Sequence, residues 1–121
     1  MQYLLMIYDD EKLWAAMSQE EGAQLYKEYF EYSAWLQEKG WFLGGNALQP
    51  TPSATTVRLR EGDRLVTDGP FAETKEQLGG YYLVECESLD DAIEAAARIP
   101  SARLGSIEVR PVMDVPDAPG Q

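Results

Sequence analysis

The sequence predicts an α+β domain in which two helices cover one face of an antiparallel sheet. The apolar residues alternate with a period of two in several short segments and take a helical period in two longer ones. These segments follow the order β-α-β, hairpin, β-α-β. At 121 residues the chain has room for one hydrophobic core, so we expect a single domain over residues 1–115 and a flexible tail at residues 116–121.

The first strand and the long helix come first in this order. The strand is expected from Gln2 to Tyr8, where apolar side chains point to both faces, as in strands that are buried on two sides. Ser18 and Glu21 have the spacing of a capping box at a helix start, and Gly40 is suited to the helix end. One stripe of this helix faces the core and consists of Leu25, Tyr29, Tyr32 and Leu36.

A strand, a hairpin and a long loop are expected in the middle of the chain. Trp41 to Leu48 predicts a strand with a kink at its glycine pair. The run TTVRLR-EGD-RLVT predicts a β-hairpin, with Val57 and Leu59 on one side and arginines on the other. The loop TDGPFAETKEQLGG, Thr67 to Gly80, is longer than a hairpin connection requires, and its ionisable groups make it a candidate site.

A strand, a helix and a strand complete the chain. The strands are expected at Tyr81 to Glu87 and at Ile107 to Met113. The helix between them is expected to begin after Ser88, which caps it. The helix has a narrow apolar stripe suited to close packing against a sheet, made of Leu89, Ala92, Ile93, Ala96 and Ala97. The whole order is a ferredoxin-like βαββαβ arrangement with an inserted hairpin.

The second face of this sheet also needs a cover. The helices reach one face only, whereas Gln2 to Tyr8 and Tyr81 to Glu87 are apolar on both. We expect a homodimer, or a higher oligomer, in which the sheets of two copies pack on one another. The alternative is a strongly curled sheet that encloses a ligand within a monomer.

Composition excludes several classes of partner. The formal net charge is −11, whereas nucleic acids and anionic membrane surfaces attract clustered basic residues. We therefore expect neither nucleic acid nor membrane as a partner. The apolar run at the start is short for a signal peptide, and the single Cys86 cannot form an internal disulfide, so we expect a cytoplasmic protein.

The chain contains no histidine. Histidine is the commonest transition-metal ligand and the commonest general base near neutral pH. We therefore expect no metal and no other cofactor, and catalysis would have to use carboxylates, tyrosines or a lysine. Cys86 is expected to be a small buried apolar residue, because no histidine is present to activate its thiol.

The segment DGPFAETKEQLGGYYLVE, Asp68 to Glu85, closely resembles the signature of the YCII-related proteins of the DGPF subgroup. The segments YLLMIYDDE, TTVRLREG and IEVRPVMD fit the same pattern, so the resemblance extends to Val115. It implies a dimeric α/β barrel. Some relatives are encoded beside, or fused to, extracytoplasmic-function sigma factors, which points to a regulatory role.

The resemblance also bears on the site. The wider family is thought to use a histidine–aspartate pair, and one branch dehydrochlorinates an aromatic compound. The position of that histidine, about three turns before the terminal glycine of the first helix, falls near Tyr29. The partner carboxylate corresponds loosely to Glu73 or Glu76. Without a histidine, this mechanism does not carry over.

Several loop residues remain candidates with two interpretations each. Asp68 is either the carboxylate of an Asx-turn or a general base at the mouth of the barrel. Glu73 and Lys75 either form surface ion pairs or point inward to hold a polar ligand. Thr74 is expected to cap a single helical turn over KEQL. We interpret the loop first as a structured clasp and second as a site.

Three tyrosines are further candidates. Tyr29, Tyr32 and Tyr81 are either core and interface residues or line an apolar pocket in which their hydroxyls bind a ligand. The function these observations favour is a small-molecule-binding or regulatory homodimer with a small polar or aromatic ligand.

The alternative function is a small cytoplasmic lyase or isomerase. Asp68 or Glu73 would then be the general acid or base, and Lys75 or a tyrosine the electrophilic partner. A purely structural partner of a transcription factor is a third class. Whether the chain is an enzyme stays open, and an inward-facing carboxylate with a raised pKa would favour catalysis.

Overall fold

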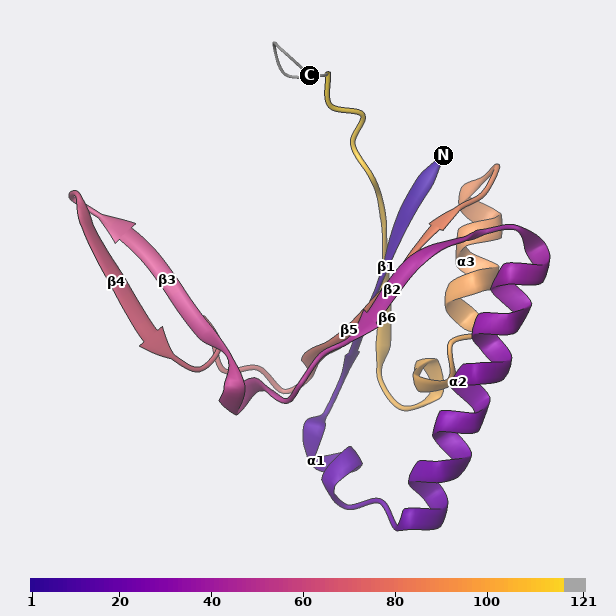
Figure 1. Ribbon diagram of the computed structural model, residues 1–121, viewed down its shortest axis with the longest axis horizontal. Helices are drawn as coiled ribbons and strands as arrows, with labels where there is room; N and C mark the ends of the chain where they lie inside the picture. Colours follow the sequence, from indigo (N-terminus) through magenta and orange to yellow (C-terminus); the bar gives the residue numbers. More distant parts are fainter. Residues whose placement is uncertain (117–121) are drawn as a thin grey trace.

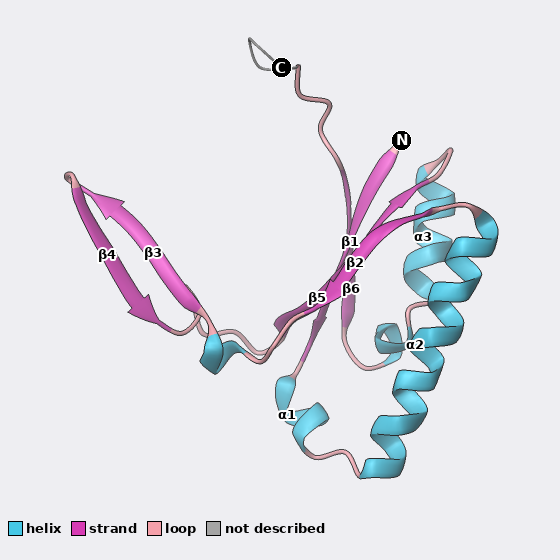
Figure 2. Cartoon of the chain, viewed as in Figure 1, coloured by secondary structure: helices cyan, strands magenta, loops and turns pink. Residues whose placement is uncertain are grey.

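The computed structural model describes residues 1–116, so the predicted tail beyond Pro116 lies outside the described residues. The strands are β1 (Gln2–Asp9), β2 (Phe42–Ala47), β3 (Thr55–Arg60), β4 (Asp63–Asp68), β5 (Gln77–Glu85) and β6 (Ser106–Pro111). The helices are α1 (Glu11–Ala15), α2 (Gln19–Lys39) and α3 (Leu89–Ala97), with short 3-10 helices η1 (Thr51–Ser53) and η2 (Pro100–Arg103) (Figure 2). This α+β order is compatible with the ferredoxin-like prediction.

The strands form two separate antiparallel sheets. The larger has the order β2-β5-β1-β6, and β3 and β4 form the smaller one. In the larger sheet β1 is central, so that Tyr3 lies opposite Val84 of β5 and Pro111 of β6. Helices α2 and α3 lie on one face of this sheet, as predicted (Figure 1). Within the described chain the larger sheet is open and does not close into a barrel.

The hydrophobic core lies between the larger sheet and the helices. Alternate residues of β1 face it, and Leu5 is fully buried. The predicted stripe of α2 is confirmed, since Leu25, Tyr32 and Leu36 are buried and the half-buried Tyr29 packs against the core that contains Tyr32 and Leu36. We refer to the larger sheet with α1, α2 and α3 as the body.

The stripe predicted for α3 is partly wrong. The buried residues are Ala92, Ala95 and Ala96, whereas Leu89 and Ile93 are about half exposed and Ala97 is exposed. Alanine at the contact lets the helix approach the sheet closely, and this turns the two larger side chains outward. Ser88 caps the helix as predicted, because its side chain accepts from the N–H of Asp91.

The ends of α2 match their sequence signals. The Ser18 hydroxyl accepts from the N–H of Glu21 at 3.1 Å, and the Glu21 carboxylate accepts from the N–H of Ser18 at 3.3 Å. Gly40 ends the helix with a φ of 75°, a left-handed conformation that costs glycine little. At the helix start, the two hydrogen bonds between Ser18 and Glu21 satisfy N–H groups that have no partner inside the helix.

Two local predictions are wrong. No helical turn forms over KEQL, because Gln77 and Leu78 already pair with Asp9 and Tyr8 as the start of β5. Thr74 is not a cap; its hydroxyl donates to the carbonyl of Glu76 at 2.7 Å.

A short helix, α1, follows β1 and was not predicted. It begins after Asp10, whose side chain accepts from the N–H of Lys12 at 2.9 Å. The sequence shows a break after the first strand but too few residues for a helical period. Among the described residues, no helix has the length and apolar character needed to cross a membrane.

The face of the larger sheet that lies away from the helices is lined by half-buried side chains. We call it the open face, and its residues are Leu4, Met6, Tyr8, Tyr81 and Leu83. Cross-strand neighbours on this face include Leu4 with Leu83 and Met6 with Tyr81.

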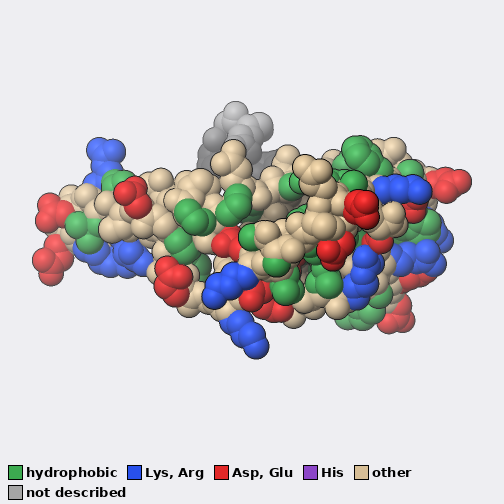
Figure 3. Space-filling view, turned by 90° about the horizontal axis from the view of Figure 1, so that it is seen from below, with side chains coloured by type: hydrophobic (Ala, Val, Ile, Leu, Met, Phe, Trp, Pro, Cys, Tyr) green, Lys and Arg blue, Asp and Glu red, His purple; other side chains and the backbone are tan. Residues whose placement is uncertain are grey.

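The hairpin of β3 and β4, Thr55 to Asp68, projects from the body, and we call it the arm (Figure 1). Its tight turn consists of Glu61 and Gly62, which both have positive φ values, 52° and 83°. That conformation is typical of the turn that joins two twisted strands. Figure 3 shows the arm extending to the left of the body, with acidic and basic side chains near its end.

Candidate functional site

Asp68 lies at the foot of the arm as the last residue of β4, and it is exposed. The N–H of the next residue, Gly69, donates to the carbonyl of Ala54 at 2.6 Å. This backbone contact joins the two ends of the hairpin at its base. Asp68 lines neither of the two hollows described below.

The loop between the arm and β5 is tied to the body by Glu76 and Gln77. The Ser106 hydroxyl donates to the Glu76 carboxylate at 3.0 Å. The Gln77 side chain accepts from the N–H of Glu11 at 3.0 Å and donates to the carbonyl of Thr74. Glu73 and Lys75, which were candidates for an inward-facing site, are both exposed.

The three candidate tyrosines lie in two different places. The Tyr29 hydroxyl donates to Ser101 Oγ at 2.7 Å, and the Tyr32 hydroxyl donates to the carbonyl of Ala95 at 2.7 Å. Both lie between helix and sheet. Tyr81 is on the open face, where its hydroxyl accepts from the side chain of Asn46 at 2.7 Å. The structure therefore does not bring Tyr81 together with Tyr29 and Tyr32.

A buried polar group sits where the ends of β1, α1 and η2 meet α2. We call it the polar cluster, and it consists of Asp9, Trp14, Tyr29 and Ser101. Asp9 is 4% exposed and Ser101 is fully buried. Trp14 Nε1 donates to Asp9 Oδ2 at 2.7 Å, and Ser101 lies close enough to the Asp9 carboxylate to lower its pKa. Ser101 thus neighbours both Asp9 and Tyr29.

Burial governs the ionisation of this cluster. It raises the pKa of Asp9. The hydrogen bond from Trp14 and the nearby Ser101 act in the opposite direction, and the carboxylates of Glu76 and Glu11 add to the rise. Burial also raises the pKa of Tyr29 to about 12. The phenol is therefore protonated at neutral pH and is available as a hydrogen-bond donor.

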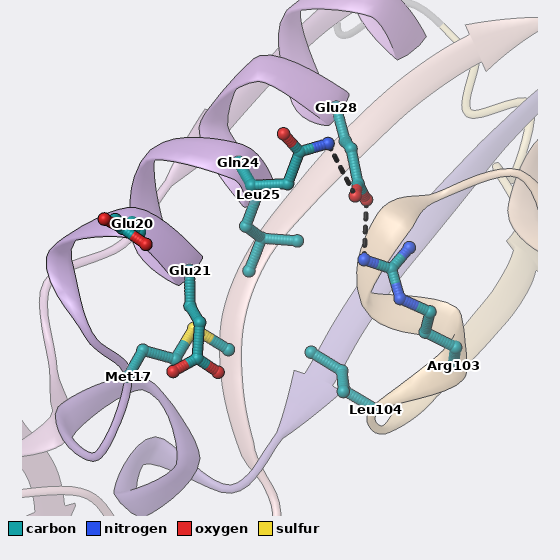
Figure 4. Close-up of a pocket in the computed structure, with 8 residues that line it drawn as sticks. All are labelled: Met17, Glu20, Glu21, Gln24, Leu25, Glu28, Arg103 and Leu104. Carbon is teal, nitrogen blue, oxygen red and sulfur yellow. Dashed lines mark hydrogen bonds and ion pairs between the residues drawn. The ribbon is translucent and has the colours of Figure 1, made fainter.

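A groove of about 390 Å³ runs between the N-terminal half of α2 and η2 (Figure 4). Its walls carry both charged and apolar side chains, namely Met17, Glu20, Glu21, Gln24, Leu25, Glu28, Arg103 and Leu104. Arg103 reaches across the groove to Glu28, with 2.6 Å between guanidinium and carboxylate, and this contact lowers the pKa of Glu28. Leu25 and Leu104 point toward one another from opposite sides in Figure 4.

A smaller hollow of about 140 Å³ lies along another side of α2. It is lined by Tyr26, Tyr29, Phe30 and Ser33. Tyr29 therefore takes part in both the polar cluster and this hollow. Among the described residues, no group of three or more cysteine, aspartate or glutamate side chains is placed to hold a metal ion.

This arrangement has two chemical capacities. The groove offers a concave surface with apolar and charged walls, which suits a small molecule. Asp9 offers a carboxylate whose proton affinity is increased by burial, next to a phenol and a hydroxyl that donate hydrogen bonds, which suits proton transfer.

Sequence reasoning missed Asp9, although the sequence contained a signal for it. Tyr3, Leu5 and Ile7 alternate along the buried face of β1, and Asp9 is the next residue in the same phase. An acidic residue in register with a buried strand face indicates a buried carboxylate. Trp14 and Ser101 carried no comparable signal, because their positions depend on how α1 and η2 fold back.

Known proteins provide a context for this geometry. The chain matches the YCII-related domain over residues 1–116. It belongs to the YCII-related domain family. This YCII-related chain is 40% identical over 114 residues to Uncharacterized protein R00369 of Rhizobium meliloti (strain 1021). The aligned residues make up 93% of this chain and 92% of that relative. The family resemblance noted in the sequence is therefore confirmed.

Proposed function

We propose that this YCII-related protein is a homodimer that binds a small polar molecule in the groove between α2 and η2. The groove itself carries the proposal, since its volume of about 390 Å³ lies within the usual range of ligand sites. We assign the chain to the DGPF subgroup on its motif and to the cytoplasm, where the buried thiol of Cys86 would stay reduced.

The charges along the groove indicate the class of ligand. Its walls hold three carboxylates, on Glu20, Glu21 and Glu28, and one guanidinium, on Arg103. Arg103 is already bound by Glu28 at 2.6 Å, so the excess charge is negative. The leucines on both sides supply apolar contact. A small amine with an aliphatic or aromatic body is therefore the best match.

Thermal shift with matched ligands tests the binding site. A ligand that binds only the folded state raises Tm by mass action. We expect phenethylamine to stabilise the protein more than phenylacetate, which has a similar body and the opposite charge. The shift should fall in Glu20→Gln and persist in Glu31→Gln, whose site is exposed on α2 outside the groove. Equal shifts with both ligands, or none with any amine of a wider panel, would contradict the proposal.

The homodimer is supported by the open face. Its side chains, among them Met6 and Leu83, form a contiguous apolar surface across β1 and β5. Surfaces of that kind are usually covered by a partner, and a two-fold pair of sheets covers both copies at once. Sedimentation equilibrium at micromolar concentration should give a dimer for the natural chain and a monomer for Leu83→Arg. A monomeric natural chain would refute this part of the proposal.

A regulatory role beside an extracytoplasmic-function sigma factor belongs to the same proposal and is supported by the family resemblance. Calorimetric titration of the protein with a sigma factor encoded beside it tests this role. We expect binding that changes when the groove ligand is present. Absence of binding both with and without the groove ligand would contradict the regulatory role and leave the proposal of ligand binding in the groove unchanged.

A second candidate function, a lyase or isomerase, is favoured by the polar cluster. Asp9 is buried with a raised pKa, whereas Asp68 and Glu73 are exposed. Tyr29, near the position where the resemblance implies a histidine, lies in the same cluster. If a screen finds activity, Asp9→Asn should abolish it, while Asp68→Asn and Glu73→Gln should retain it. Full activity in Asp9→Asn would exclude this centre.

A further inference from the structure

The arm has an exposed apolar side. Val57 and Val66 lie opposite one another on its two strands, and Leu59 follows on the same side. These three side chains are 58%, 58% and 69% exposed. A two-stranded hairpin has little stability of its own in water, so a strip of this kind gains stability when another surface covers it.

The position of the arm indicates which surface that is. The arm leaves the body between β2 and β5, the two strands at one side of the larger sheet. In Figure 1 it stands on the side of the sheet away from the helices, so the arm and the open face form the two sides of a V. A second copy seated on the open face would therefore lie against the arm.

The distribution of charge also favours a second copy of this chain as the partner of the arm. The arm carries Arg58, Arg60 and Arg64 together with three acidic residues, and is neutral. The rest of the chain has 7 basic and 18 acidic residues, which gives a net charge of −11. Two such bodies repel one another, and Arg64, which pairs with Leu59 and so shares the apolar side of the arm, would place positive charge next to the acidic body of the other copy.

We propose that the arm grips a second copy of this chain, packing the side formed by Val57, Leu59 and Val66 against the body of the partner. By two-fold symmetry each copy gives one arm and receives one. The inference rests on the homodimer of the proposed function and adds a second, separate contact to it. The open face supplies the apolar centre of the assembly, and the arms hold it from both sides.

Sedimentation equilibrium on arm variants tests this contact. The double variant Val57→Ser, Leu59→Ser should weaken dimerisation about tenfold or more, as loss of well-packed apolar contacts does. The matched control is Leu65→Ser, on the other side of the arm and 46% exposed, which should leave the dimer constant unchanged. Circular dichroism establishes that each variant keeps the fold of the body.

A cross-linking measurement covers the case in which the double variant loses the hairpin itself. A benzophenone attached at Leu59→Cys should give a covalent dimer on illumination, and one attached at Leu65→Cys should give much less. The arm contact alone would be overturned if the double variant left the dimerisation constant unchanged and the benzophenone at position 59 gave no covalent dimer. A monomeric natural chain would overturn the arm contact together with the homodimer.

Discussion

The body and the arm use the same sequence pattern with opposite results. In β1 the alternating residue Leu5 is fully buried, whereas in β3 the alternating residue Leu59 is 69% exposed. The difference lies in what each face meets. Helices α2 and α3 cover β1, while β3 and β4 chiefly contact one another within the described chain. Alternation thus determines which side chains share a face, and the neighbouring elements determine whether that face is buried.

Stability follows the same division. The body holds its own hydrophobic core, so its amides should exchange with solvent only on global unfolding. The arm has few buried contacts, and its amides should exchange by local opening until a partner covers it.

The largest effect is expected from Leu36→Ala in the body. Leu36 is fully buried on α2, so the substitution should lower the free energy of unfolding by ~2–5 kcal/mol through lost burial and a cavity. Urea unfolding at fixed protein concentration measures this change. The control is Leu65→Ala in the arm, which should stay within ~0.5 kcal/mol because the side chain is already partly in water. Equal costs at the two sites would erase the distinction between body and arm.

Gly105→Ala should have the next largest effect. A Cβ at this position would collide with the backbone of Tyr8 and Asp9, so the substitution should cost ~1–3 kcal/mol by overpacking. Gly22→Ala is the control, since nothing lies within 4 Å of the added methyl and alanine favours a helix by up to ~1 kcal/mol. In the same urea unfolding assay, Gly105→Ala should therefore lower the free energy of unfolding and Gly22→Ala should raise it. Stabilisation by Gly105→Ala would mean that β6 does not approach β1 this closely.

Asp9→Asn should change how stability depends on pH. Burial raises the pKa of Asp9 in the folded state above its ordinary value, so the folded chain binds the proton more tightly than the unfolded chain. Stability from this group is complete below the unfolded pKa and is lost as the pH rises through the folded pKa. The free energy of unfolding of Asp9→Asn relative to the natural chain should therefore increase as the pH rises from below the unfolded pKa of Asp9 through its raised folded pKa.

Urea titrations at several pH values measure this difference. Asp63→Asn serves as the control, because Asp63 is exposed at the turn of the arm. A difference between Asp9→Asn and the natural chain that stays constant with pH would refute the burial effect at Asp9.

The smallest effect is expected at the turn of the arm. Glu61 has a φ of 52°, which is unfavourable for most residues and easier for asparagine. Glu61→Asn should stabilise the hairpin by ~0.5–1 kcal/mol. Hydrogen exchange of the arm amides detects this change locally, with Glu61→Ala as the control, because alanine lacks the polar side chain that eases the left-handed conformation in asparagine. Faster exchange in Glu61→Asn would show that the turn differs from the one described.

Local signals in the sequence were sufficient for most of the body and for the arm. The capping pair Ser18 and Glu21 and the stripe through Leu36 depend on residues close together in the chain, and they were predicted correctly. The hairpin was found because its alternating strands flank a glycine turn. Its separation from the body was not predicted, since it depends on what the finished fold leaves uncovered.

The candidate site was harder to predict because long-range contacts create it. Asp9 meets Trp14 locally, but Ser101 reaches it only after η2 folds against β1. The groove likewise needs Glu28 and Arg103, which lie far apart in the sequence. The loop motif around Asp68 drew attention through its ionisable residues, yet its candidate side chains at Asp68, Glu73 and Lys75 are exposed.

The central position of β1 has a consequence for how the chain folds. Its neighbours β5 and β6 are the last two strands in the sequence, so every hydrogen-bonded pairing of β1 joins distant parts of the chain. Contacts of that kind slow folding, because a long loop must close before any pairing is gained. During synthesis, both edges of β1 stay unpaired until β5 and β6 have left the ribosome. The arm consists of adjacent strands, so it can form before β1 is paired.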